Sequence, residues 1–287
     1  MEKGKLRYII HKKSKGNSNL SAQLYQMYFF EHILDRVSLS KYKNNIILKG
    51  GLLLSSIIGD DERTTKDMDA TLKNFPLEIQ SVEKIISEIL HIDTGDNISF
   101  EVIDIKDIRE DDEYGGFKIN ILAKMSTLKI HLAIELTTGD KITPREIEYS
   151  YNSHFENRKI SILAYTIETV IAEKYQTIIA RDIYNTRMKD FYDIYVLVNE
   201  NKSKINLNNL ILAIKNTFTY RNTEIDIEEI KEQLENMKIN NRLISLWENY
   251  QKTAPYSEKI KYEELYTALI WITNILSEEK TVVEINS

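Results

Sequence analysis

The stretch of residues 49–70 reads KGGLLLSSIIGDDERTTKDMDA and predicts both a local fold and a chemistry. The apolar residues 46–48 before it predict a short buried strand that runs into a turn at Gly50 and Gly51. The following LLLSSIIG predicts a helix that opens at this turn and ends at Gly59. The alternation in KDMDATL then predicts a second strand carrying Asp67 and Asp69.

The glycine pair is suited to a phosphate. Glycines at a strand-to-helix junction let a ligand approach the backbone closely. The helix that follows directs free N–H groups and its positive dipole end at the same place. Ser55 would add a hydroxyl donor only if the helix began near it. A plain tight turn is the alternative explanation for Gly50 and Gly51.

Asp67 and Asp69 are spaced to bind a divalent cation. On a strand, residues i and i+2 point to the same side, about 6.5–7 Å apart along the chain. Two such carboxylates repel each other unless a cation lies between them. Mg²⁺ is commonly held by one or two carboxylates together with substrate phosphates, and Mn²⁺ is the second candidate. The alternative, a solvent-exposed strand face, is weakened by the nearby candidate phosphate turn.

Glu135 is the third acidic candidate. It lies near the end of the apolar run LKIHLAIEL, residues 128–136, whose leucines and isoleucines alternate onto the other face. An unpaired charge in such surroundings is costly. Glu135 is therefore predicted to be a metal ligand or a general base, with a structural glutamate as the alternative.

The bulk composition describes a globular protein. The chain has 287 residues, 42% of them hydrophobic, and no cysteine, which allows two modest domains and excludes disulfides and thiolate metal sites. It has no apolar run near the ~20 residues needed to span a bilayer and no recognisable signal peptide. We therefore expect a cytoplasmic protein without membrane contact.

The net charge of -6 limits nucleic-acid binding to local patches. Three basic clusters, at residues 11–15, 158–159 and 181–189, permit such contacts, and simple solubility is the alternative explanation for each.

Periodicity divides the chain. Residues 19–37 predict an amphipathic helix, and three strand-like runs follow at 98–108, 117–125 and 128–138, with a polar DDEYGG turn after the first. Helical periodicity prevails from about Tyr165. We predict an N-terminal helical segment at 1–44, a mixed α/β core at 45–160 and a helical domain at 161–287.

Five blocks together carry a family resemblance: LKGGLLLSS, RTTKDMDA, IELTTGDKITPREIEYSY, AEKYQTIIAR and NTRMKDFYDIY. In this order they resemble the AbiEii/AbiGii-type nucleotidyltransferases, toxins of bacterial type IV toxin–antitoxin and abortive-infection (phage-defence) systems. The resemblance implies an α/β (α+β) fold: a nucleotidyltransferase-fold mixed sheet flanked by helices, followed by an α-helical C-terminal domain. It also implies transfer of a nucleoside monophosphate from an NTP, with release of pyrophosphate.

The resemblance assigns roles to residues. Gly50 and Gly51 match the family's turn, Asp67 and Asp69 match its metal pair, and Glu135 stands where the family more often has aspartate. The metal ligands expected are Asp67, Asp69 and Glu135. The catalytic residues expected are Asp67, Asp69, Glu135, Lys174 and Asp190. The nucleotide-binding residues expected are Gly50, Gly51, Ser55, Arg63, Thr65, Lys66, Lys174, Arg181, Arg187 and Lys189.

The helical half is expected to supply cations. Lys174 and Arg181 are seven residues apart and share a helix face, and the resemblance implies that Lys174 touches the triphosphate. Asp190 borders an apolar stripe on the next predicted helix. Simple surface ion pairs, Arg187 with Asp190 and Lys189 with Asp193, are the alternative reading of this block.

These observations favour a Mg²⁺-dependent nucleotidyltransferase toxin acting on RNA, with the acceptor end of tRNA as the expected acceptor by family analogy. A cognate antitoxin encoded nearby is the expected partner. The alternatives are nucleotidyl or phosphoryl transfer to a protein or small-molecule hydroxyl, and a catalytically silent nucleotide-binding partner module.

Overall fold

The computed structural model describes residues 1–59, 63–76, 78–108 and 115–285, with the side chains of 280–285 left aside. The chain divides into two compact units. The first comprises Met1–Asp140 and Glu146–Tyr165, and the second comprises Lys141–Arg145 and Thr166–Ser287. The first 44 residues, which the periodicity set apart, are grouped with the first unit.

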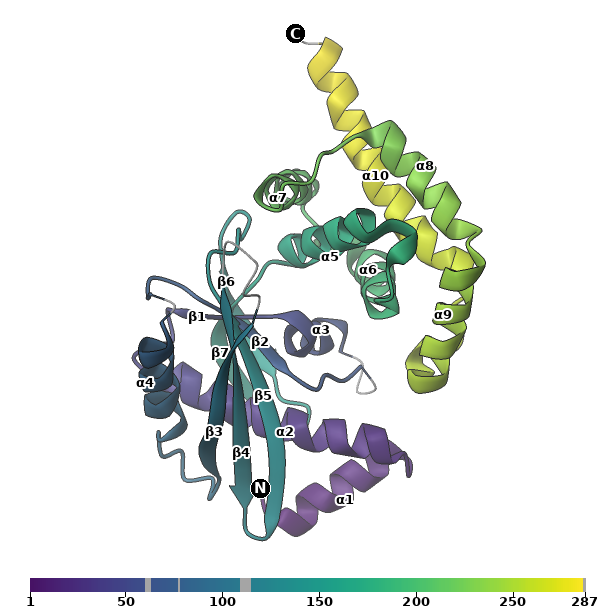
Figure 1. Ribbon diagram of the computed structural model, residues 1–287. Coiled ribbons are helices and arrows are strands. Elements are labelled where there is room, and N and C mark those ends of the chain that lie inside the picture. Colours follow the sequence, from purple (N-terminus) through teal and green to yellow (C-terminus); the bar gives the residue numbers. More distant parts are fainter. Residues whose placement is uncertain (60–62, 77, 109–114, 286–287) are drawn as a thin grey trace. The chain divides into compact units, whose positions relative to one another are not determined.

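The first unit is built on a seven-stranded mixed sheet (Figure 1). Its strand order is β3-β4-β5-β2-β1-β7-β6. The β1–β7 and β2–β5 pairs are parallel, and the other neighbours are antiparallel. The strands are β1 (Ile46–Lys49), β2 (Met68–Leu72), β3 (Ser99–Ile108), β4 (Gly116–Met125), β5 (Leu128–Thr137), β6 (Ile147–Asn152) and β7 (Lys159–Ala164).

Four helices accompany this sheet: α1 (Lys3–Ser14), α2 (Ser18–Leu39), α3 (Gly50–Ile58) and α4 (Ile79–Leu90). Side chains of α2 and α4, including Ile33 and Ile86, meet the apolar face of the sheet around Met68 and Ile134. Strand alternation therefore leaves Asp69 and Glu135 on the opposite face. The sheet thus separates an apolar core from a polar face that carries the predicted carboxylates.

Strand β5 is longer than its neighbour β2. Its pairing with β2 covers only residues 134–137, whereas its pairing with β4 covers all of 128–137. Along the remaining edge, the side-chain amide of Gln26 on α2 donates to the backbone carbonyl of His131 at 3.1 Å. Helix α2 therefore lies beside this part of β5.

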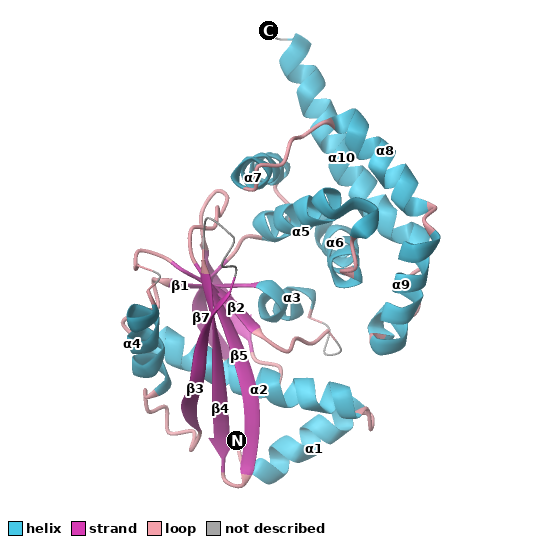
Figure 2. Cartoon of the chain, viewed as in Figure 1, coloured by secondary structure: helices cyan, strands magenta, loops and turns pink. Residues whose placement is uncertain are grey.

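The second unit is helical (Figure 2). Its helices are α5 (Ile167–Arg181), α6 (Met188–Asn201), α7 (Leu207–Tyr220), α8 (Ile227–Lys238), α9 (Asn241–Thr253) and α10 (Tyr262–Ile285). The core includes Phe191 and Ile194 of the predicted stripe, both fully buried. Thr143 of the short segment 141–145 accepts a hydrogen bond from Thr166 Oγ1 at 2.8 Å through its carbonyl, which ties the segment to the start of α5.

The strongly periodic elements are confirmed. The helix predicted at 19–37 is α2, the strand–turn–helix is β1 and α3 with Gly59 as the left-handed cap, and the three strand runs are β3, β4 and β5. The DDEYGG turn lies mostly outside the described residues. Helices α1 and α9 and strands β6 and β7 were not predicted, because each contributes only a few buried positions and so has a weak apolar pattern.

One boundary was wrong. Asp67, expected on a strand, lies just before β2, which begins at Met68. Within the described residues, no helix is both long and apolar enough to cross a membrane.

Candidate functional site

Asp69 and the glycine turn fit together at the start of α3. Gly50 adopts a φ of 63°, and a Cβ at this position would lie 1.8 Å from Oδ2 of Asp69. No side chain can occupy that space, since such a contact would displace the carboxylate or the backbone. The need for glycine at position 50 therefore comes directly from the carboxylate beside it.

The start of α3 also binds this carboxylate. The backbone N–H of Gly51 donates to Asp69 Oδ2 with an N–O distance of 3.3 Å. An anion at a helix N-terminus is favoured by the free N–H groups and the helix dipole. In this ligand-free chain the helix start that was predicted to meet a phosphate meets Asp69.

A row of four charges crosses the polar face of the sheet. Lys49 is in register with Asp69, Asp69 with Glu135, and Glu135 with Lys118. Side chains in register on neighbouring strands share a face and lie close together. Lys118 Nζ donates to Glu135 Oε1 at 2.9 Å, so Glu135 has a cationic partner and Asp69 lies between Glu135 and Lys49.

The electrostatics of this row disfavour a charged Asp69. Burial, the charge of Asp67 and the charge of Glu135 raise the pKa of Asp69 to about 6, while Lys49 and the Gly51 N–H act in the opposite direction. The positive charges nearby are thus too weak to compensate three carboxylates. A cluster of this kind is a candidate for a functional site.

The donor set fits a hard divalent cation. Asp67, Asp69 and Glu135 offer only carboxylate oxygens, which Mg²⁺ and Mn²⁺ prefer. No group of three or more acidic, histidine or cysteine side chains in the described part of the chain is arranged closely enough to hold a metal ion. Two carboxylates suffice when substrate phosphates complete the coordination, so Asp67 and Asp69 are the residues that would hold the ion.

The loop before β2 is tightly held. Thr65 is buried and its Oγ1 donates to Asp67 Oδ1 at 2.9 Å, which orients that carboxylate. Arg63 is also buried, and its Nη1 donates to the carbonyl of Thr64 at 2.9 Å. Lys66 is exposed. Thr65 and Lys66 thus lie beside the carboxylates, whereas the guanidinium of Arg63 is directed into the protein.

Ser55 does not lie at the start of the helix. Helix α3 begins at Gly50, and the fully buried Ser55 donates its hydroxyl to the carbonyl of Leu52 at 2.8 Å. The condition under which it would contact a phosphate is therefore not met in this structure.

A buried polar network next to Asp69 was missed by the sequence analysis. Lys49 Nζ donates to Asp140 Oδ2 at 2.6 Å and to Thr137 Oγ1 at 2.7 Å. Thr71 Oγ1 also donates to Asp140, and it shares a hydrogen bond with the hydroxyl of Tyr165. Burial works against the charge of Asp140, but Lys49 and these hydroxyls hold the pKa of its carboxyl well below its usual range. The only sequence signals were a lysine that ends an apolar strand and the aspartate of TTGD.

The predicted residues of the second unit form their own cluster. Lys174 on α5 donates to Asp190 Oδ1 at 2.6 Å and lies 2.8 Å from Asp193 Oδ2, both on α6. Burial opposes the charge of Lys174, but Asp193 and Asp190 together raise its pKa. Burial also opposes the charge of Asp190, but Lys174 and Arg187 lower its pKa to about 2.

Three further cations lie near this cluster in sequence. Arg187 Nε donates to Asp190 Oδ2 at 2.6 Å, so the ion pair considered as an alternative is present. Arg181 is exposed at the end of α5, and Lys189 is half-buried in the first turn of α6. The structure therefore joins Lys174, Asp190 and Arg187, and adds Asp193, which had been considered only as a surface partner.

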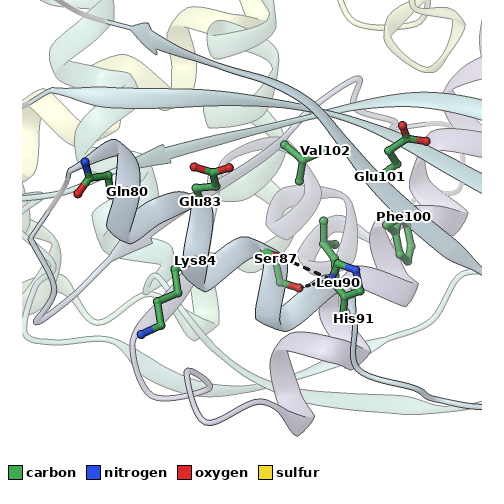
Figure 3. Close-up of a pocket in the computed structure, with 9 residues that line it drawn as sticks. All are labelled: Gln80, Glu83, Lys84, Ser87, Leu90, His91, Phe100, Glu101 and Val102. Carbon is green, nitrogen blue, oxygen red and sulfur yellow. Dashed lines mark hydrogen bonds between the residues drawn. The ribbon is translucent and has the colours of Figure 1, made fainter.

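A cavity of about 470 Å³ lies elsewhere in the first unit, between α4 and β3 (Figure 3). Its described lining includes Glu83, Lys84 and His91 of the helical side and Phe100 and Glu101 of the strand, and contains none of the predicted site residues. The candidate site is thus an arrangement on the polar sheet face and not this cavity.

Comparison with protein families decides the assignment. The model of a family described as "Nucleotidyl transferase AbiEii toxin, Type IV TA system" matches residues 32–268, which is most of the chain. The chain belongs to the AbiEii family. This AbiEii protein is therefore a member of a nucleotidyltransferase toxin family of type IV toxin–antitoxin systems, as its motifs indicated.

One solved structure supports the fold. The AbiEii protein is similar to JHP933 from Helicobacter pylori, with 15% identity, a TM-score of 0.51, and coverage of 92% of this chain and 96% of that one. A second H. pylori structure, named as a candidate nucleotidyltransferase, has 16% identity, a TM-score of 0.47, and coverage of 91% and 97%. At these identities the likeness to JHP933 supports the fold alone. The comparison with curated proteins found no match.

The Gly50 geometry predicts that Gly50→Ala displaces the Asp69 carboxylate. Gly59→Ala is a matched control, because Gly59 also has a positive φ, of 70°, but a Cβ there meets nothing within 4 Å. Both variants should lose roughly 1 kcal/mol or more from backbone strain. Only Gly50→Ala should change the carboxyl resonance of Asp69 in selectively ¹³C-labelled protein. An unchanged resonance would show that the two groups are not in contact.

The raised pKa of Asp69 predicts that Asp69→Asn stabilises the fold at neutral pH. The folded state holds the proton more tightly than the unfolded chain, whose value is near 3.8, so the free energy of unfolding should fall as pH rises from about 4 to about 6. At pH 8 Asp69→Asn should therefore be about 1–3 kcal/mol more stable than wild type, and at pH 4 the difference should vanish.

Urea denaturation with a chelator present measures this difference. Asp107→Asn, which changes an exposed carboxylate on β3, should stay within ~0.5 kcal/mol of wild type. Equal stability of wild type and Asp69→Asn at pH 8 would contradict the electrostatic strain.

Proposed function

We propose that this chain is a Mg²⁺-dependent nucleotidyltransferase toxin of the cytoplasm. It transfers a nucleoside monophosphate from an NTP to an RNA hydroxyl, with the acceptor end of tRNA as the substrate, and releases pyrophosphate. A cognate antitoxin would restrain it. The observation that carries the proposal is the strained carboxylate cluster of Asp67, Asp69 and Glu135 at the start of α3.

The residues at the start of α3 and before β2 have separate roles in phosphate binding and in metal binding. Gly51 donates its N–H to Asp69, and the other backbone N–H groups in the first turn of α3 can donate to phosphate oxygens. Asp67 is oriented by Thr65, and Asp69 is oriented by Gly51, so both carboxylates are positioned before a ligand arrives. When bound by these two, Mg²⁺ supplies charge neutralisation for the phosphates and the leaving group.

Proton transfer also has a candidate on this face. Glu135 is partly exposed and lies in register with Asp69, so it could accept the proton of an attacking hydroxyl. Its ion pair with Lys118 competes with that role, because Lys118 already donates to one of its oxygens.

The first test is transfer of label. Wild-type protein, incubated with each labelled NTP, Mg²⁺ and total RNA, should label RNA, and Asp67→Ala and Asp69→Ala should reduce the label to background. Their folds should remain, because each substitution removes a repelling charge. Asp107→Ala serves as the control for loss of an exposed carboxylate. Near wild-type turnover in either site variant would remove the metal assignment, and NTP binding without transfer to any acceptor would favour a catalytically silent module.

The second test concerns Lys174, which we expect to contact the triphosphate. The single change Lys174→Ala is unsuitable, because it would remove the cation that the buried Asp190 and Asp193 share, at a cost of about 3–5 kcal/mol. The double variant Lys174→Met/Asp193→Asn removes one charge of each sign and leaves Asp190 paired with Arg187.

Calorimetric titration of NTP with Mg²⁺ should show binding roughly 10- to 150-fold weaker in the double variant. Asp193→Asn alone is the control and should bind NTP nearly as wild type does. Wild-type affinity in the double variant would remove Lys174 from the nucleotide site.

A further inference from the structure

Positive charge is concentrated at the start of this acidic chain. The first 16 residues contain six basic residues and one acidic residue, whereas the remaining 271 contain 32 basic and 43 acidic residues. These first residues form most of α1, which lies outside the part of the chain matched by the family model. The charge of α1 is thus a feature of this chain that the family assignment leaves unexplained.

Two lysines of α1 share one side of the helix with an exposed aromatic ring. Lys5, Tyr8 and Lys12 follow at intervals of three and four residues and so share a face. All three are exposed, and 68% of Tyr8 is accessible to solvent. Leu6 and Ile10 on the opposite side are buried. We call Lys5, Tyr8 and Lys12 the α1 stripe.

The α1 stripe is not neutralised within the part of the chain that the structure describes. No ion pair there joins Lys5, Arg7 or Lys12 to a carboxylate. The other basic clusters differ in this respect: Arg158 pairs with Asp35 and Glu156, and Arg187 pairs with Asp190. Lys5 and Lys12 therefore keep their charge available for an external anion.

Helix α1 leads toward the candidate site. At its beginning, Lys3 donates to Thr127 in the turn between β4 and β5. At its end, the chain turns into α2, where Gln23 accepts a hydrogen bond from Thr64, three residues before Asp67. Twelve helical residues span about 18 Å. The α1 stripe thus runs from the tip of the β4–β5 hairpin toward the loop that carries the carboxylates.

The neighbouring sheet surface continues this path. Lys129 and His131 are exposed on β5 and share a face with Glu135 by strand alternation. Six residues of strand span about 20 Å, which corresponds to about six steps of a nucleic-acid strand at ~3.4 Å each. Lys5 and Lys12 of α1 and Lys129 of β5 thus lie within one unit of the protein.

We propose that α1 is the docking helix for the acceptor RNA. Lys5 and Lys12 bind backbone phosphates, and the ring of Tyr8 stacks on an unpaired base, the combination by which single-stranded nucleic acid is held. The proposal rests on the proposed function, in which RNA is the acceptor. An anionic membrane is disfavoured as the partner, because the apolar side of α1 is already buried in the protein and cannot insert.

The test measures RNA binding directly, with fluorescently labelled unfractionated tRNA over a range of salt concentrations. Lys5→Gln/Lys12→Gln should lower the salt slope by about 1.4–1.8 and weaken binding at low salt by about tenfold or more. The control Lys43→Gln/Lys84→Gln removes the same charge from exposed lysines of the first unit and should bind as wild type does. Tyr8→Ala should weaken binding by roughly 5- to 150-fold, whereas Tyr8→Phe should retain it.

Three results would overturn the proposal. The first is wild-type RNA affinity in both α1-stripe variants, and the second is an absence of RNA binding by the wild type. The third is that the variants lose binding to phosphatidylglycerol vesicles while their RNA binding is unchanged. If the variants lose RNA binding and yet the wild type transfers no label to RNA, the docking helix stands and the proposed transfer reaction fails.

Discussion

The contact between the Asp69 carboxylate and the backbone at Gly50 and Gly51 is the constraint on which the site depends. It requires that β1 end where α3 begins, that β2 lie beside β1, and that no side chain occupy position 50. The two ends of one short connection, the glycine turn and the aspartate, are thereby brought back together. The same packing brings together a helix start and a carboxylate that can hold a cation.

The negative charge of Asp69 is unfavourable in this arrangement, and the neighbouring lysines do not neutralise it. Lys49 is in register with Asp69, but its ammonium group is engaged by Asp140 and Thr137 on the same sheet face. Lys118 is engaged by Glu135, a member of the cluster itself. Lys49 is therefore committed to Asp140, and Lys118 neutralises Glu135 rather than Asp67 or Asp69. A carboxylate that its neighbours destabilise gains more from an incoming cation, which is the expected trade between stability and function.

The sequence predicted what local periodicity can encode and missed what depends on distant partners. The alternation around Asp69 and the apolar run into Gly50 identified β1, β2 and α3, because strand and helix periods are visible within a few residues. The pairing of Lys49 with Asp140 joins residues 91 positions apart, and no local pattern specifies it. Lys174 was predicted from the family motif, but its enclosure between Asp190 and Asp193 follows only from the packing of α5 against α6.

The unequal lengths of β2 and β5 have a consequence for solubility. Residues 128–133 of β5 pair with no strand of the described residues along one side, and an uncovered strand edge is a template for pairing with another chain. The α1–α2 hairpin lies along this edge, and Gln26 occupies the carbonyl of His131. Lysines beside an edge also discourage association. The N-terminal helices therefore cover the strand edge and oppose self-association of the sheet. A shortened chain that lacked them would expose this edge and tend to aggregate, although it would still contain every residue of the site.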